Sequence, residues 1–554
     1  MVPKYLDALV VGLGFGGIYQ LKKLRDQGLD VKAIDKASDV GGTWYWNRYP
    51  GAVSDSYSHV YRYSWDHEDL INYPWNTRYL QGPDILKYLQ HVVERHDLRK
   101  DMQFGTELLG SDWNEIERRW VVNLSTGETL RVKYLVTALG VLSKTNFPAI
   151  PNLHKFQGKL YHTANWPQDA DLRNKRVGIV GNGSTGVQVI TAIAKADEVK
   201  QLLCFQRNPQ YSVPAGNGIL SPQERQEIND NYKETWSKAK QTLFAFGFEE
   251  STRPTFSVGP EERERVFEEA WQKGNGFWFM FCTFGDITFD ERANFEAQEF
   301  IRKKIRQAVK DPEKARKLCP TELYARRPLC DSGYYEQFNK ENVDIVDIKA
   351  SPIVELTEKG IKTSDGTIYE LDVIICATGF DAVDGSYARV AIRGREGESL
   401  KDHWVDTGPT SYLGIMVPNF PNLFMIGGPN GPFSNQPPAL ETQAEIITDL
   451  IARVETVATN KSHDTNEARS NGGTSGGEER CGVIEVELEA EKGWTDHCEG
   501  ISAASLFRKV DSWIFGKNIP GKSDAVMFYF AGLGPYRKET AAILEDNLRG
   551  FKIS

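Results

Sequence analysis

The chain has 554 residues, of which 40% are hydrophobic and 26% are charged, so it is long enough for several globular domains of roughly 100–200 residues each. Its formal net charge of −10 argues against a nucleic-acid-binding protein, which needs a basic face. The seven scattered cysteines form no CxxC pair, which argues against a zinc ribbon or a redox dithiol and favours a reducing, cytoplasmic compartment.

The chain is not expected to enter or cross a membrane. Its most apolar run, residues 277–284, is far shorter than the ~20 residues that span a bilayer. The first residues lack a charged start followed by a long apolar core, so no secretory signal is expected. No group of residues predicts a metal site.

The first motif is a glycine-rich turn that directly follows a strand-like apolar run. Residues 6–11 suit a buried parallel strand, and residues 31–34 suit a second strand that ends at an acid, 18 residues after the last glycine of the turn. A lone glycine turn is weak evidence, but the complete strand, turn, helix, strand and acid favour a dinucleotide site. The residues predicted to hold the cofactor there are Gly12, Gly14, Phe15, Gly16, Gly17 and Asp35.

An aromatic segment follows at residues 41–51, which read Gly-Gly-Thr-Trp-Tyr-Trp-Asn-Arg-Tyr-Pro-Gly. Three consecutive aromatic rings beside glycines and a proline favour a rigid loop over a helix or a strand. Such a loop can present flat faces to a flavin ring, although an ordinary packing loop is the alternative. The predicted cofactor contacts are Gly42, Thr43, Trp44, Trp46, Asp55 and Tyr61.

A second dinucleotide unit begins at residue 176. A strand at 176–180 leads into a second glycine turn, and a helix to about residue 196 and a strand at 201–205 complete the unit. This strand ends in Arg207 instead of an acid, and an arginine there can bind the 2′-phosphate of NADP; a solvated surface cation is the alternative. The first site is therefore interpreted as an FAD site and the second as an NADP(H) site. The predicted NADP contacts are Gly181, Gly183, Ser184, Thr185, Gly186, Gln188, Arg207 and Asn208.

The rest of the chain predicts a helical insertion and a return to the first domain. Helices are expected near 222–245, 260–274 and 293–310, the first with a capping box at Ser221, and the aromatic run 277–284 lies among them. That run could line an apolar substrate cavity or simply pack. Strands at 342–348, 371–376 and 422–426 and a helix at 439–456 follow, and the polar segment 459–480 predicts a flexible loop.

These elements predict an α/β protein with two Rossmann-like dinucleotide-binding domains and a helical insertion in the NADP domain. The expected FAD domain comprises 1–142 and 380–554, and the NADP domain comprises 143–213 and 325–379, with the insertion at 214–324. Residues 156–167 are interpreted as a linker between the two glycine turns.

That linker carries a resemblance to a known family. Phe156, Gly158, His162, Trp166 and Pro167, placed between two glycine turns, resemble the fingerprint of Baeyer–Villiger monooxygenases, which are class B flavoproteins. The loop 41–51 with Asp55, the Gly379-Phe-Asp381 segment, and Trp513 followed by Pro520-Gly-Lys522 are also similar to that family. The likeness covers nearly the whole chain. It departs at 459–480 and at Val53-Ser54, where some members carry an arginine.

The resemblance implies a two-step reaction with FAD, NADPH, O₂ and a ketone. NADPH reduces FAD, the reduced flavin captures O₂ as a C4a-peroxide, and its attack on the ketone yields an ester or lactone; sulfide oxidation is also implied. By resemblance, Arg327 is the active-site arginine held by Asp55, Arg326 joins Arg207 on the 2′-phosphate, and Trp513 lies near the nicotinamide ribose.

His162 and Trp166 are expected to act through the hinge. The main alternative is a flavin monooxygenase that oxygenates nitrogen or sulfur. A non-catalytic nucleotide sensor is a further alternative. The sequence predicts neither the particular ketone nor the oligomeric state.

Overall fold

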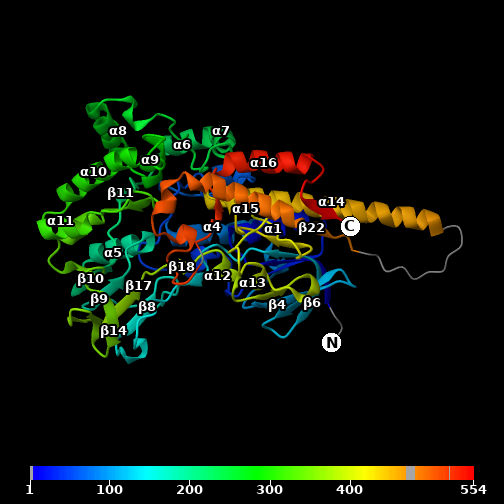
Figure 1. Cartoon of the computed structure of the whole chain (residues 1–554), viewed down its shortest axis with the longest axis horizontal. Helices are drawn as coiled ribbons and strands as arrows, with labels where there is room; N and C mark the ends of the chain where they lie inside the picture. Colours follow the sequence, from blue (N-terminus) through cyan, green and yellow to red (C-terminus); the bar gives the residue numbers. More distant parts are fainter. Residues whose placement is uncertain (1–3, 470–480, 523) are drawn as a thin grey trace.

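A large mixed sheet forms the half of the molecule that contains the first glycine turn. The computed structural model describes residues 4–469, 481–522 and 524–554 (Figure 1). The central strand β1 (Lys4–Val11) lies between β2 (Val31–Ile34) and β6 (Thr129–Thr137), and all three are parallel. These strands are rich in Val, Leu and Ile because helices cover the sheet, as for α1 (Phe15–Asp26), which packs on α14 (Gln436–Arg469).

The chain returns to this sheet late in the sequence. Strand β20 (Leu423–Met425) pairs in parallel with β6, with Met425 opposite Thr137. The remaining strands are β3 (Met102–Gln103), β4 (Leu108–Asn114), β5 (Arg119–Leu124) and β19 (Ala391–Arg393). The expected return of the strand at 422–426 to the first domain is therefore confirmed.

A second, fully parallel sheet holds the second glycine turn. Its strands run in the order β13 (Val343–Asp347), β10 (Gln201–Gln206), β9 (Arg176–Val180), β17 (Val373–Cys376) and β8 (Lys159–His162). Helix α5 (Ser184–Ala196) follows β9. A small antiparallel sheet of β14 (Ile353–Thr357), β15 (Gly360–Thr363) and β16 (Ile368–Glu370) precedes β17.

The helical insertion lies beyond the second sheet and extends over the first half of the molecule (green, Figure 1). It contains α6 (Pro222–Asp230), α7 (Tyr232–Ala239), α8 (Pro260–Lys273), α9 (Gly276–Cys282), α10 (Glu291–Ala308) and α11 (Pro312–Leu318). Both halves of the predicted capping box at Ser221 are present. The core of the insertion is aromatic, with Phe267, Phe279 and Phe300 in mutual contact.

The predicted fold class is confirmed, but several local predictions are wrong. Residues 43–46 form a short helix, α2 (Thr43–Trp46), instead of an irregular loop, and the supposed linker 156–167 contains the edge strand β8. The helix expected over 222–245 is two helices that end at Ala239. Helix α14 continues through 459–469, because glycines begin only at residue 472, and 470–480 lies outside the described residues. The domain boundaries stay predictions.

Within the described ranges, no helix is both long and apolar enough to cross a membrane.

Candidate active site

The two glycine turns have matching backbone geometry. Gly12 and Gly181 adopt φ values of +103° and +102°, and a Cβ on Gly17 or Gly186 would lie only 1.8 or 2.3 Å from the carbonyl oxygen of Gly12 or Gly181. Only glycine therefore lets each helix pack this closely on its strand.

Both turns also leave helix N-termini free to bind anions. Gly14 and Gly183 are the N-caps of α1 and α5, neither helix has a side-chain cap, and neither carries an acid in its first turn. Their first N–H groups and the positive end of the helix dipole can therefore bind a pyrophosphate. At Gly183 a Cβ would meet nothing within 4 Å, so the backbone there is open to a close ligand. These features fit FAD at the first turn and NADPH at the second.

The aromatic segment lies directly on the first turn. Gly41 N–H donates to the Leu13 carbonyl at 2.9 Å, and a Cβ on Gly42 would be 2.8 Å from Gly14 Cα. The Trp44 indole donates to the Tyr61 hydroxyl at 3.2 Å, and the rings of Tyr61 and Phe15 meet edge to face at 5.4 Å. Aromatic faces therefore gather beside the turn, as a flavin site requires.

Asp35 ends β2 as predicted, and its carboxylate is tied to the backbone of the turn. It accepts hydrogen bonds from Leu13 N–H at 2.7 Å and Ala37 N–H at 2.8 Å. Burial raises its pKa, although these two bonds act in the opposite direction. Because a carboxylate offers about four acceptor positions, capacity remains for a ribose hydroxyl.

Arg327 and Asp55 form a bidentate ion pair. Arg327 Nη1 lies 2.6 Å from Asp55 Oδ2, and Nη2 lies 2.9 Å from Oδ1. Their side chains are only 28% and 13% exposed, and the guanidinium lies 5.0 Å from the centre of the Phe277 ring. Burial alone would lower the pKa of Arg327, but the charge of Asp55 and its hydrogen bonds raise that pKa above its ordinary value, so the site contains a permanent cation.

Helix α5 brings the second glycine turn to the segment that carries Asp55. Gln188 donates to the Val53 carbonyl at 3.0 Å and accepts from the Tyr49 hydroxyl at 2.8 Å. Gly51 lies against the same helix, where a Cβ would be 2.8 Å from Ala192 Cβ. The predicted FAD and NADP sites therefore meet beside the Arg327–Asp55 pair.

The predicted 2′-phosphate residues lie near an unpredicted lysine. Arg207 is exposed, whereas Arg326 donates to the Asp511 carbonyl at 2.9 Å and pairs with Glu322. Lys349 Nζ lies 3.1 Å from Asn208 Oδ1 and 3.8 Å from Glu322 Oε1, so it joins the two segments.

The sequence contains a signal for Lys349 that the analysis missed. Lys349 follows the C-terminal end of β13 as Arg207 follows that of β10, and these strands are parallel neighbours with Gln206 opposite Asp347. The carboxyl ends of neighbouring parallel strands meet at one edge of a sheet, where ligands bind.

Comparisons with known proteins agree with this geometry. The family model described as flavin-binding monooxygenase-like matches residues 7–212. The chain is 50% identical over 548 residues to a cyclohexanone 1,2-monooxygenase of Acinetobacter sp., a match that covers 99% of this chain and 96% of the relative. The chain belongs to the Baeyer–Villiger monooxygenase family. The predicted class of FAD-containing, NADP-dependent oxidoreductase is thereby confirmed.

Two further relatives of this family member bear on its structure and its chemistry. The crystal structure of cyclohexanone monooxygenase from Rhodococcus sp. Phi1 bound to NADP⁺ is 51% identical, with a TM-score of 0.93 and coverage of 100% of this chain and 99% of that one. A phenazine N-monooxygenase of Lysobacter antibioticus is 48% identical over 99% of this chain and 97% of its own length.

The Baeyer–Villiger fingerprint lies where the two halves join. The ring of Phe156 leaves no space for a side chain at Gly158, where a Cβ would be 2.4 Å from the ring. His162 ends the edge strand β8, and its ring lies 5.5 Å from that of Phe147 and 6.4 Å from that of Phe380. Burial lowers the pKa of His162, so its ring is neutral near pH 7.

Those two phenylalanines lie beside the paired bridge strands β7 (Lys144–Thr145) and β18 (Phe380–Asp381), which connect the sheets. Trp166 packs edge to face on Tyr161 at 5.7 Å, and Pro167 follows it. The fingerprint therefore contacts the connection between the halves, which supports the expected hinge role.

An aromatic wall beside Arg327 was only partly predicted. Phe277 and Phe281 of α9 contact Phe246 and Phe244, with ring centres 4.4 and 4.1 Å apart. The wall continues through Phe433 to Phe528 and Phe530, and Phe528 contacts Trp513 at 6.0 Å. Sequence periodicity could not find Phe244, Phe246 or Phe433, because they lie outside regular elements and converge only through tertiary contacts.

Proposed function

We propose that this chain oxygenates ketones to esters or lactones with NADPH and O₂, and that it also oxidises sulfides. The observation that carries the proposal is the bidentate Arg327–Asp55 pair, held where two uncapped dinucleotide turns converge. When bound, FAD supplies the activation of O₂ and NADPH supplies the reducing equivalents. The chain's own residues must then orient the ketone and stabilise the negative charge that develops on it.

Arg327 is suited to that electrostatic role. A ketone carbonyl becomes an oxyanion when it is attacked, and a fixed cation in a partly buried site stabilises this charge without reorganising. Asp55 holds the guanidinium in plane by two hydrogen bonds, and the Pro328 carbonyl accepts a third at 3.2 Å. Arginine has five N–H donors, so donors remain for an oxygen of the reacting groups.

The aromatic wall indicates the substrate class. Rings of the insertion and of the C-terminal segment form an apolar surface that begins at Phe277, beside the guanidinium. An apolar ketone can bury its hydrocarbon part against this surface while its carbonyl points to Arg327. The cyclohexanone-oxidising relatives make alicyclic ketones the first class to test.

Oxygenation of a ring nitrogen is the second candidate function. It is favoured by the 48% identity to a phenazine N-monooxygenase over 99% of the chain, and the aromatic wall also suits a flat heterocycle. We further propose a cytoplasmic location, because all seven cysteines are free thiols and free thiols persist in reducing compartments.

A product assay separates the two functions. The FAD-loaded enzyme is incubated in air with NADPH and, separately, with cyclohexanone, a thioether and a phenazine, and the products are identified by mass spectrometry. We expect a lactone one oxygen heavier than the ketone, and a sulfoxide. An N-oxide formed without any lactone would overturn the proposal in favour of the second candidate.

A further inference from the structure

A buried arginine lies outside the proposed active site, on the segment that follows Asp55. The Arg62 side chain is 0% exposed, and its Nε donates to the Ser58 carbonyl at 3.0 Å. The rings of Tyr73, Trp75 and Tyr88 surround its guanidinium, with Cζ 4.8, 5.1 and 4.8 Å from their centres.

A second arginine reaches the same indole from the helical insertion. Arg225 of α6 places Cζ 3.9 Å from the centre of the Trp75 ring. Its Nη2 donates to the carbonyls of Leu70, Ile71 and Tyr73 at 3.3, 2.9 and 3.3 Å. Two cations from different parts of the fold therefore share one tryptophan.

No carboxylate balances this charge among the described residues, since neither guanidinium has an acidic oxygen within 4.0 Å. The nearby Asp69 instead pairs with His91 at 2.6 Å. The positive field extends to His59, whose pKa falls to about 4, chiefly through burial and then through repulsion by the two arginines. Buried charges are normally paired, because an unpaired one costs much desolvation energy.

The cluster also holds more buried donors than acceptors. Five buried donor atoms have no acceptor among the described residues: Arg62 Nη1 and Nη2, Arg225 Nη1, Trp75 Nε1 and Tyr232 Oη. The unpartnered acceptor on α6 is Asn229 Oδ1, and one oxygen cannot serve them all. Such a surplus of unpartnered buried donors requires an explanation, for which a bound ion is one of the standard sources.

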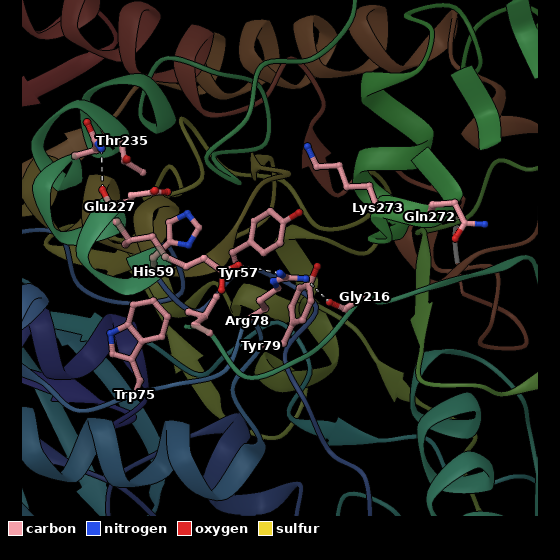
Figure 2. A pocket seen from close by; sticks show the side chains of 14 residues that line it. Tyr57, His59, Trp75, Arg78, Tyr79, Gly216, Glu227, Thr235, Gln272 and Lys273 are labelled. Atoms are coloured by element: carbon pink, nitrogen blue, oxygen red, sulfur yellow. Dashed lines mark hydrogen bonds and ion pairs between the residues drawn. The ribbon is translucent and has the colours of Figure 1, made fainter. Parts of the chain in front are cut away.

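Solvent can reach this region through a cleft between the first half and the insertion. Trp75 and His59 line the cleft, which has a volume of about 550 Å³, together with Tyr57 and residues of α6 and α8 (Figure 2). Trp75 is thus shared by the cleft wall and the arginine cluster.

We propose that a small inorganic anion of the halide class binds beside the Trp75 indole, held by N–H donors of Arg62 and Arg225. The anion neutralises two buried cations that belong to different parts of the fold. It therefore fastens the helical insertion to the half of the molecule that contains the first glycine turn.

Chloride dependence of unfolding tests this site on the FAD-loaded full chain. Tm is measured as chloride replaces gluconate at constant ionic strength, because a ligand that binds only the folded state raises Tm along a saturating curve. We expect this rise in the wild type, its loss in Arg225→Met, and its retention in Arg316→Met. Arg316 is a suitable control because it pairs with Glu313 on the exposed surface of α11.

Bromide provides a measurement that does not depend on any variant folding. Crystals of the wild type grown in bromide should show an anomalous peak beside Trp75. If no peak is found and the chloride curve is flat, the proposal is overturned, and the three aromatic faces around Arg62 alone offset its charge. A chloride rise that persists in Arg225→Met overturns it equally.

Discussion

At the scale of single residues, the account rests on a cation that its surroundings keep in place. Asp55 and Arg327 lie 272 positions apart in the sequence and meet through two short hydrogen bonds. The parallel arrangement suits the planar fork of arginine, which a lysine cannot reproduce. Phe277 shields the guanidinium from one side, so the charge acts in a partly desolvated site.

Replacing Arg327 should therefore separate two steps of the reaction. Arg327→Ala is expected to keep NADPH-dependent bleaching of the flavin, since the glycine turns are untouched, and to reduce ester formation by about 10²–10³-fold, as for loss of an oxyanion-stabilising donor. Rapid-mixing absorbance and product analysis measure the two steps. Arg316→Ala is the control, and ester formation at the wild-type rate by Arg327→Ala would contradict the assignment.

Arg207 carries a separate prediction about the choice of nicotinamide cofactor. If it binds the 2′-phosphate, Arg207→Ala should raise the KM for NADPH by about 10-fold, equivalent to ~1.4 kcal/mol, and leave that for NADH unchanged. Lys349→Ala should act in the same direction, because Lys349 contacts Asn208 and Glu322. Equal increases for both cofactors would refute the phosphate role.

At the scale of elements, the two glycines of the second turn should fail in different ways. A Cβ at Gly183 would meet nothing within 4 Å, whereas one at Gly186 would lie 2.3 Å from the Gly181 oxygen. Gly183→Ala should fold with normal FAD content but bind NADPH more weakly, since the methyl group occupies the approach of the pyrophosphate. Gly186→Ala should lower Tm, because backbone must move.

FAD absorbance, Tm and the KM for NADPH distinguish these two outcomes. A Gly183→Ala enzyme with an unchanged KM would show that the second turn does not hold the phosphates.

The elements also show what could be read from sequence. The buried strands β1, β2, β9 and β17 were predictable because continuous apolar runs lead directly into glycine turns. Strand β8 was missed because its order comes from pairing with β17 across more than 200 positions, as in His162 opposite Cys376. Similarly, α2 forms where Gly42 crosses the first turn, and no local pattern encodes that contact.

The site divides in the same way. Asp35 and the glycines follow from spacing, and Arg207 follows from its place at the end of a strand. The role of Arg327 required the family resemblance, since an Arg-Arg pair in isolation predicts an exposed surface. Lys349 and the aromatic wall depend on which segments the fold brings together.

At the scale of the whole molecule, two connections hold the halves together. The bridge strands β7 and β18 pair with each other, and Lys144 and Lys522 both bind Asp381 of β18, at 2.8 and 2.7 Å. Lys522 belongs to the segment that carries Trp513, so the C-terminal segment is tied to the bridge. A change at the fingerprint can therefore reach both cofactor sites.

Stability should also depend on pH through a histidine remote from the site. His403 lies between Glu491 and Glu398, 3.0 Å from each. Burial alone would lower its pKa, but the two carboxylates raise it above 6.5. The stabilisation is therefore complete below about pH 6.5, the pKa in the unfolded chain, and is lost as pH rises through the folded-state pKa.

The Tm difference between wild type and His403→Gln measures this effect across pH. Tm is preferred to a free energy of unfolding, because a multidomain flavoprotein does not unfold in two states. The advantage of the wild type should shrink as pH rises. An advantage that is constant, or that grows with pH, would show that His403 is not charged in the folded protein.

The most direct test of the central claim follows the oxygen atom itself. The FAD-loaded enzyme is supplied with NADPH, cyclohexanone and isotopically labelled O₂, and the product is analysed by mass spectrometry with fragmentation. Ketone oxygenation predicts a lactone with one labelled atom in the ring and an unlabelled carbonyl. If NADPH is consumed and labelled hydrogen peroxide is the sole product, while a phenazine yields a labelled N-oxide, the ketone assignment is contradicted.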